Sequence, residues 1–341
     1  MNKSMINTDV CYCEVCNTPL RKIGKISYFD DKLCNQELFL CDVCGLISTN
    51  TKIPFEKNLL AIEKDNYLSK VIELYVKTAF SGKKVGMVNA NFSHVSDDAF
   101  RELIELSNND ELLIISEYLE HTKSLFDFLN ILKTQKPKYI VTEVPVYDFY
   151  DNSATHMYDY FIKSHNYYFS SYTIAYMMAS LGYSLFDMKY DLGIGLNMPM
   201  VFPCALSIWV KNSNYKVSFA YKPNIMNYIL QCEKEIDEIS KQIDSILPDD
   251  CPIAVWGAGN YFEKLFAMTS LNKKNIVKIY DGNSLKWGKV CVGQTVSKFD
   301  STDIETGIVN YIFIASNTAK NDIFNKLVNE LHISENCIKI L

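Results

Sequence analysis

The sequence predicts an α/β fold made of three successive regions, and three observations carry the prediction. The first 45 residues hold two C-x-x-C pairs. The middle of the chain alternates short apolar runs with amphipathic segments, which is typical of helices packed on a mostly parallel sheet. The stretch "IAVWGAGNYFEKLFAM" predicts a strand, a glycine turn and a helix. We place the three regions at residues 1–55, 56–220 and 221–341.

Composition and charge exclude several classes of protein. A chain of 341 residues with 48% hydrophobic and 22% charged residues has the composition of a globular protein with a substantial core. The formal net charge of −6 argues against a broad nucleic-acid-binding surface. Apolar runs stay well short of 18 residues, and the start "MNKSMINTDV" lacks the apolar core of a signal peptide. We therefore expect no membrane partner and a cytoplasmic location.

The cysteines predict a metal site near the N-terminus. Six of the eleven precede residue 45 and the others are scattered, which argues against a disulfide framework. Two C-x-x-C pairs on tight turns offer four thiolates, a donor set that suits tetrahedral zinc. The expected ligands are Cys13, Cys16, Cys41 and Cys44. Gly45 follows the second pair, where a knuckle needs a permissive backbone. Four thiolates leave no open position, so the zinc should be structural, with Cys11 and Cys34 as alternative ligands.

The middle region carries a strand–helix pattern. Helices are predicted at 56–80, at 96–107 and in "SLFDFLNILKT", and buried strands at 85–88, 112–115 and 139–144. Ligands of such sheets bind at the carboxyl ends of the strands. The polar residues at or just beyond these ends are Asn89, Glu117, His121 and Glu143. After the first strand a cofactor fold would normally place glycines, whereas this chain has Asn89, Ala90 and Asn91.

An aromatic-rich block follows Pro145 and holds His165 in "KSHNYYFSS". An imidazole that titrates near neutral pH, close to a hydroxyl such as that of Tyr168, suits a general base. The alternative is a structural histidine that bonds a backbone group among core aromatic residues. The residues alone favour this structural alternative.

The C-terminal region predicts its own small sheet. A long helix at 224–247 ends at Pro248, and the strand–turn–helix with Gly257 and Gly259 follows. The next predicted strand, in "NIVKIYDGN", ends in Asp281, 24 residues after Gly257, where an acidic residue can meet a ribose hydroxyl. The third glycine of a dinucleotide fingerprint is replaced by Phe262. We therefore expect a tight turn in a Rossmann-like domain rather than a bound dinucleotide, with "YIFIASN" as a further strand.

Taken together, the modules resemble the zinc-containing sugar C-methyltransferases that act on nucleotide-linked deoxysugars. The resemblance covers nearly the whole chain. It rests on "CDVCGLI", "IISEYLEHTKSLFDFL", "TEVP" and "IKSHNYYFS", and most specifically on "VWGAGNYFEKL", "YDGNSLKWGKVCVGQTV" and "ASNTAKNDI" near the C-terminus. The resemblance implies a class I S-adenosylmethionine fold for the middle region, preceded by the zinc knuckle domain and followed by the Rossmann-like domain.

The resemblance also implies a reaction and a set of site residues. A base removes a proton next to the ketone of a nucleotide-linked keto-deoxysugar, and the carbanion takes the methyl group of S-adenosylmethionine. His165 occupies the place of the base, and we add Tyr168 to the catalytic set. The expected cofactor-binding residues are Asn89, Asn91, Glu117 and His121. The expected substrate-binding residues are Glu143, Gly193, Gly195 and Lys286.

The chain departs from the family pattern at two places. In the Y-H-E-H catalytic segment the first three residues are Ile162, Lys163 and Ser164, and only His165 is kept. The S-adenosylmethionine fold is shortened by about one strand–helix–strand unit, and it lacks the glycine loop and an evident ribose carboxylate. Two alternatives therefore stand beside the methyltransferase: an isomerase-type enzyme on a sugar nucleotide without methyl donor, and a non-catalytic paralogue that acts as a binding protein.

Overall fold

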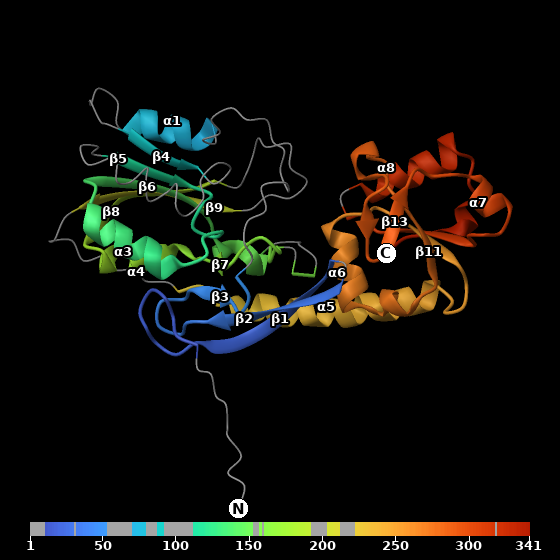
Figure 1. The fold of residues 1–341 in the computed structure, drawn as a ribbon, viewed down its shortest axis with the longest axis horizontal. Coiled ribbons are helices and arrows are strands. Elements are labelled where there is room, and N and C mark those ends of the chain that lie inside the picture. Colours follow the sequence, from blue (N-terminus) through green and yellow to red (C-terminus); the bar gives the residue numbers. More distant parts are fainter. Residues whose placement is uncertain are drawn as a thin grey trace, which may run out of the picture. The chain divides into compact units, whose positions relative to one another are not determined.

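The computed structural model describes residues 11–30, 32–52, 70–79, 87–91, 112–152, 157–158, 160–191, 203–211, 222–317 and 319–341. These residues form a mixed α/β structure with several sheets, and the chain divides into two compact units (Figure 1). The first unit contains Met1–Gly24, Glu37–Ser153 and Tyr160–Met226; the second contains Lys25–Gln36, Ala154–Asp159 and Asn227–Leu341. No helix among the described residues combines the length and the apolar composition needed to cross a membrane.

The first unit is built on a five-stranded sheet of order β4-β5-β6-β9-β8. Its strands are β4 (Met87–Asn91), β5 (Leu112–Ser116), β6 (Tyr139–Pro145), β8 (Tyr183–Asp191) and β9 (Cys204–Lys211). β4, β5 and β6 are parallel neighbours, whereas β9 runs antiparallel to both β6 and β8. The strands predicted at 112–115 and 139–144 are confirmed, and the β8–β9 pair is an addition that the apolar pattern did not predict. The helix expected at 96–107 lies outside the described residues.

Helices cover both faces of this sheet (Figure 1). Successive side chains of β5 point to opposite faces, so Leu112 and Ile114 pack with α1 (Lys70–Ala79) in one hydrophobic cluster. Leu113 and Ile115 belong to the cluster that contains side chains of α3 (Leu125–Gln135) and α4 (Ser171–Ser180). Burial on both faces explains why β5 is a continuous apolar run. The helix expected at 56–80 is described only from residue 70.

A second sheet of the order β1-β2-β3-β7 joins the N-terminal cysteines to the rest of the first unit. Its strands are β1 (Arg21–Asp30), β2 (Lys32–Leu40), β3 (Ile47–Thr49) and β7 (Tyr167–Tyr168). β3 pairs antiparallel with β7 over two residues. The short helix η2 (Tyr147–Asn152) precedes β7 in the chain. Three of the four predicted ligand cysteines pack in the same hydrophobic cluster as residues of β5, α3 and α4. The cysteine region therefore shares its core with the five-stranded sheet.

The second unit is built on a six-stranded sheet of order β12-β13-β11-β10-β14-β15. Its strands are β10 (Ile253–Trp256), β11 (Ile276–Tyr280), β12 (Val290–Cys291), β13 (Gln294–Ser297), β14 (Tyr311–Ile314) and β15 (Ile338–Lys339). All neighbours are parallel except β12 and β13. The parallel pairing expected between residues 253–256 and 277–280 is confirmed. The expected strand at 311–317 is present but ends at residue 314.

Helices lie along this second sheet as well. The helices are α5 (Ile225–Ile246), α6 (Asn260–Met268), α7 (Thr302–Glu305) and α8 (Lys320–Asn325), with the short helices η3 (Ser270–Lys273), η4 (Ser284–Lys286), η5 (Lys326–Glu330) and η6 (Glu335–Cys337). The apolar sides of α5 and α6 pack with Ile253 and Val255 of β10. Ala254 and Trp256 point the other way and pack with the segment that contains α8 and η5. The helix predicted at 224–247 is confirmed as α5.

Candidate functional site

The two C-x-x-C pairs fold into matching turns. The amide of Asn17 donates to the carbonyl of Cys13 at 2.8 Å, and the amide of Gly45 donates to the carbonyl of Cys41 at 2.9 Å. Both residues that follow a pair have left-handed backbone, with φ of 55° at Asn17 and 79° at Gly45. Asparagine and glycine are the residues that tolerate this conformation best. The sequence therefore repeats one local turn twice, and the Asn17 half of the repeat was missed in the sequence analysis.

The four expected ligands are brought together. The Sγ atoms of Cys13 and Cys44 lie 3.5 Å apart, those of Cys16 and Cys41 lie 3.3 Å apart, and all four lie within 4.8 Å of one another. Four sulfurs around a tetrahedral zinc at about 2.3 Å lie roughly 3.8 Å apart, so this group can hold a metal such as zinc. Neither Cys11 nor Cys34 belongs to the group, so neither replaces one of the four expected ligands in this structure.

Proton sharing among these thiols has a clear direction. The hydrogen bond from Cys44 lowers the pKa of Cys13 to about 5, because it stabilises the thiolate. The same pairing raises the pKa of Cys44 strongly, and burial raises that of Cys16. The Thr18 hydroxyl lies 3.1 Å from the sulfurs of both Cys16 and Cys41. The group therefore consists of four sulfurs, two of which contact the hydroxyl of Thr18.

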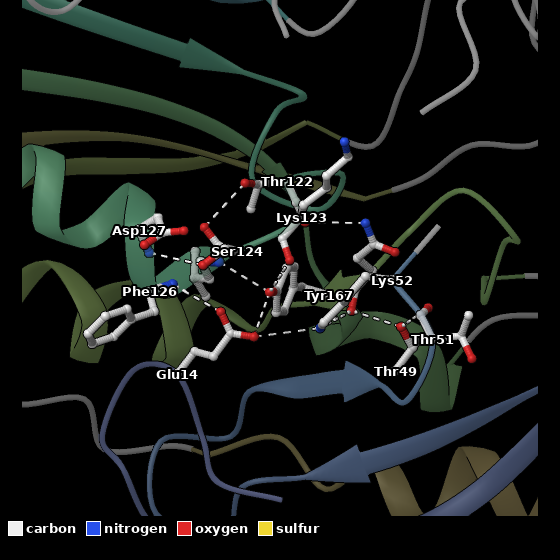
Figure 2. A network of polar contacts seen from close by, with 12 residues as sticks. Glu14, Thr49, Thr51, Lys52, Thr122, Lys123, Ser124, Phe126, Asp127 and Tyr167 are labelled. Atoms are coloured by element: carbon white, nitrogen blue, oxygen red, sulfur yellow. Dashed lines mark hydrogen bonds and ion pairs between the residues drawn. The ribbon is translucent and has the colours of Figure 1, made fainter. Parts of the chain in front are cut away.

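Glu14, which lies between Cys13 and Cys16 in the first C-x-x-C pair, connects this knuckle to the start of α3 (Figure 2). One carboxylate oxygen accepts from the amide of Phe126 at 3.0 Å and the other accepts from the hydroxyl of Tyr167 at 2.7 Å. The Tyr167 oxygen in turn accepts from the amide of Leu125 at 3.1 Å. A carboxylate is favourable there because the first amides of a helix lack intrahelical acceptors. Ser124 completes this helix start by accepting from the amide of Asp127.

Lys52 also belongs to the network in Figure 2, and its ammonium lies over the ring of Tyr167. Its ammonium lies 3.5 Å from the centre of the Tyr167 ring and 3.8 Å from the Glu14 carboxylate, and it donates to the carbonyl of Asn166. Burial lowers the pKa of Lys52 to about 8, and the charge of Glu14 limits this fall. The knuckle, α3 and β7 are thus held together by contacts of charged and aromatic groups.

The carboxyl ends of β5 and β6 bring a second set of polar residues together. Ser116 and Glu143 are register partners, and the Ser116 hydroxyl donates to the Glu143 carboxylate. The amide of Glu117 donates to the carbonyl of Glu143 at 3.0 Å. Glu117 has a φ of 48°, a left-handed conformation that is uncommon for a glutamate and clusters at functional sites. The turn after β5 therefore presents Glu117 to solvent while Glu143 stays buried.

Hydrogen bonds hold residues 164–167 next to the turn after β5. The Glu120 carbonyl accepts from the amides of Asn166 and Tyr167, at 2.7 and 3.2 Å. The side-chain amide of Asn166 donates to the carbonyls of His121 and Thr122, at 3.1 and 3.2 Å. These backbone contacts join segments more than forty residues apart, and they place His165 beside His121.

Two imidazoles and one carboxylate converge at this point. The rings of His121 and His165 pack edge to face with centroids 4.6 Å apart. His121 donates through Nδ1 to the carbonyl of Ser164 at 2.8 Å, which leaves Nε2 as an acceptor. That Nε2 lies 4.0 Å from the Glu120 carboxylate. One nitrogen from each ring and one oxygen of Glu120 lie within 4.8 Å of one another.

Burial changes the proton affinity of these groups. Glu117 is exposed as a residue, but desolvation of its carboxyl group, and to a smaller extent the charge of Glu143, raise its pKa to about 7. Burial also raises the pKa of Glu120 well above its ordinary value. It lowers the pKa of His121 to about 4, and burial together with the nearby His121 lowers the pKa of His165 well below its ordinary value, so both imidazoles are neutral near pH 7. The cluster thus combines neutral imidazoles with one accessible carboxyl that titrates near neutrality.

The other expected site residues have varied surroundings. The Tyr168 hydroxyl is buried and donates to the carbonyl of Ile162 at 2.9 Å. Asn89 and Asn91 lie on β4, and their side chains are outside the described part of the structure. Gly193 and Gly195 also lie outside the described residues. Two functional candidates were missed, Glu120 and Glu14; Glu120 had a weak signal, because it directly precedes His121.

Residues of the second unit itself form the hydrogen bonds and close contacts at its glycine turn. Asp281 accepts from the amides of Ala258 and Asn283, at 2.9 and 2.8 Å, and from the ammonium of Lys286 at 2.8 Å. Gly257 has a φ of 117°, and a Cβ atom there would lie 2.7 Å from the carbonyl oxygen of Ala315. The glycine is thus needed for chain packing, and the acidic residue is occupied by protein donors. Lys286, expected to bind substrate, is one of those donors.

Comparison of the chain with known protein families gives no match, and none of the curated proteins matches it.

Proposed function

We propose that the protein is an S-adenosylmethionine-dependent C-methyltransferase that removes a proton next to the ketone of a nucleotide-linked keto-deoxysugar. The observation that carries this proposal is the group of acid–base residues at the carboxyl edge of the five-stranded sheet. Glu117 is accessible there, with a pKa of about 7, beside the buried Glu143 and the neutral His121 and His165. A base works best when its pKa lies near the working pH.

Glu117 is the preferred base in this proposal, because it is the solvent-accessible member of the group. It takes the proton from the carbon next to the ketone and later returns it to solvent. His165, the base expected from the resemblance, is 5% exposed and stays neutral, so a substrate reaches Glu117 more readily. Ser116 donates to Glu143 and fixes that carboxylate next to Glu117. The left-handed backbone of Glu117 points to a conformation kept for function.

Two observations support S-adenosylmethionine as the partner, which would supply the methyl group when bound. The parallel strands β4, β5 and β6 bring residues 89–91, Glu117 and Glu143 to one edge, and such edges are where cofactors bind. The antiparallel β9 between β6 and β8 agrees with the class I fold that the resemblance implies. The nucleotide-sugar acceptor rests on the resemblance and on the proton chemistry of Glu117.

Deuterium exchange separates the candidate functions. In heavy water, incubation with a nucleotide-linked 4-keto-deoxysugar should place deuterium next to the ketone, as seen by mass spectrometry, even without methyl donor. Glu117→Gln should lower this exchange roughly 100-fold or more. Glu238→Gln, in an exposed i,i+4 ion pair on α5, is the matched control and should leave it unchanged.

Calorimetric titration with S-adenosylmethionine completes the test. Exchange together with cofactor binding supports the methyltransferase. Exchange without cofactor binding replaces it with the isomerase-type enzyme. Absence of both leaves the non-catalytic binding protein, and the proposal is then wrong.

We further infer that the metal held by the four cysteines is a structural zinc. All four donors are cysteine sulfurs, and a closed tetrahedral site of four cysteines is typical of structural zinc. Elemental analysis of protein purified without chelator should find zinc bound with thiolate ligation. Iron at that position, or no metal at all, would contradict the inference.

A further inference from the structure

We propose that Glu120, His121 and His165 form a second metal site, which binds a divalent transition-metal ion such as zinc. Two imidazole nitrogens and one carboxylate are a donor set that proteins use for zinc and for iron(II), and three protein ligands leave a position open for water or a substrate oxygen. The inference goes beyond the proposed function and does not depend on it.

The donor atoms already converge. One atom from each of the three side chains lies within 4.8 Å of the other two. Donors around a tetrahedral zinc at about 2.1 Å lie roughly 3.4 Å apart, so a closing movement of about 1 Å completes the site. Rotation about side-chain bonds provides such a movement while the backbone contacts between the two segments stay in place.

The Glu120 side chain supplies the independent observation that a ligand belongs here. It is 2% exposed, and its Oε2 atom has no hydrogen-bond partner among the described residues. A buried carboxylate oxygen without a partner costs free energy, and such atoms require an explanation. The other oxygen faces Nε2 of His121 at 4.0 Å, and that nitrogen is an acceptor because Nδ1 donates to Ser164. When Glu120 is ionised both groups are acceptors, and a cation between them stabilises the pair.

The surroundings of His121 are those of a metal ligand. Metal-binding histidines usually donate their second nitrogen to a carbonyl or carboxylate, which fixes the tautomer and the ring orientation. The bond from Nδ1 to the Ser164 carbonyl at 2.8 Å does this for His121. Asn166 donates to the carbonyl of His121 and thereby holds the backbone that carries the ligand.

Cobalt titration of the full-length protein tests the site. Stripped protein should take up two equivalents of Co²⁺ in two distinguishable phases. One phase gives the thiolate-to-cobalt charge-transfer absorption of the cysteine site, and the other gives d–d absorption without it. Glu120→Gln and His165→Gln should weaken the second phase by more than roughly 100-fold, since loss of a supporting residue alone costs 10- to 100-fold.

Two controls keep the result interpretable. His332→Gln removes a histidine that belongs to neither group of converging ligands and should leave both phases unchanged. For wild-type protein alone, proton NMR with two equivalents of Co²⁺ should reveal hyperfine-shifted imidazole N–H signals, which four cysteines cannot produce. Uptake of one equivalent, absence of these signals, or a second phase unchanged in both cluster variants would overturn the proposal.

Discussion

The two larger sheets of this protein differ at the carboxyl ends of their parallel strands. At the edge of the second unit, Asp281 accepts three protein donors, and Gly257 is fixed by the close approach of a carbonyl. At the edge of the first unit, Glu117 is exposed in a left-handed conformation, and Glu120 has an oxygen without a partner among the described residues. Both edges carry polar residues where ligands bind in such folds. The second unit thus satisfies its carboxylate with protein donors, whereas the first unit leaves a carboxyl oxygen at its edge that protein groups among the described residues do not satisfy.

We expect the two units to be stabilised separately, and loss of the cysteine site tests this. Cys41→Ser should destabilise the first unit by roughly 5 kcal/mol or more, because metal binding is folding free energy for such a site. Hydrogen exchange measured by mass spectrometry should rise in peptides of β5 and α3 and stay unchanged in β10 and β14. Equal exposure of both units would show that they unfold as one and would remove the basis of the comparison.

Gly257→Ala should be the largest effect at the edge of the second unit. We expect a loss of about 3 kcal/mol in the free energy of unfolding, from the positive φ and from the clash with the Ala315 carbonyl. Gly293→Ala is the matched control, since its φ is 81° but nothing lies within 4 Å of the added Cβ. It should cost about 1 kcal/mol. Equal losses in denaturant titrations would mean that the close approach does not matter.

Asp281→Asn should lower the free energy of unfolding by about 2 kcal/mol, because a side-chain amide cannot accept all three hydrogen bonds that the carboxylate accepts. Asp237→Asn, on an exposed part of α5, should stay within about 0.5 kcal/mol of wild type. If Asp281 instead served a nucleotide ribose, the variant would keep its melting temperature and lose binding of a dinucleotide. That outcome would place a ligand at the edge that we describe as structural.

Glu117→Gln should give the smallest effect, with the opposite sign. The folded-state pKa of about 7 is raised, so protonated Glu117 contributes stability that is fully present below its ordinary pKa and is lost as pH rises through 7. The amide resembles the protonated acid. The variant should therefore have a higher melting temperature than wild type at pH 8 and the same melting temperature at pH 4. Both proteins should be measured at the same metal content, because a nearby cation lowers the pKa of Glu117. A lower melting temperature at pH 8 would identify Glu117 as structural.

The sequence predicted those parts of the molecule that local patterns determine. The strands β5, β6, β10, β11 and β14 are short apolar runs between breakers, and the cysteine turns are fixed by spacing. The strands β1 and β2 were not predicted, because "RKIGKISYFD" and "KLCNQELFL" mix polar and apolar residues without a clear period. Glu120 acquires its place only through contacts with residues 164–167, and Asp281 only through Lys286 and Ala258. Local sequence therefore indicated the position of Asp281 at a strand end, and of Glu120 only that it directly precedes His121, but not the partners of either residue.

The position of Glu14 sets an order of events during synthesis. All four cysteines have left the ribosome once residue 44 has emerged, so metal can bind while most of the chain is unmade. The partners of Glu14, the amide of Phe126 and the hydroxyl of Tyr167, come 112 and 153 residues later. At 5–20 residues per second this is a delay on the order of ten seconds. If the four cysteines bind metal during that interval, the carboxylate of Glu14 stays in water until Phe126 and Tyr167 are made, and the growing chain then packs onto a loop whose shape is already fixed.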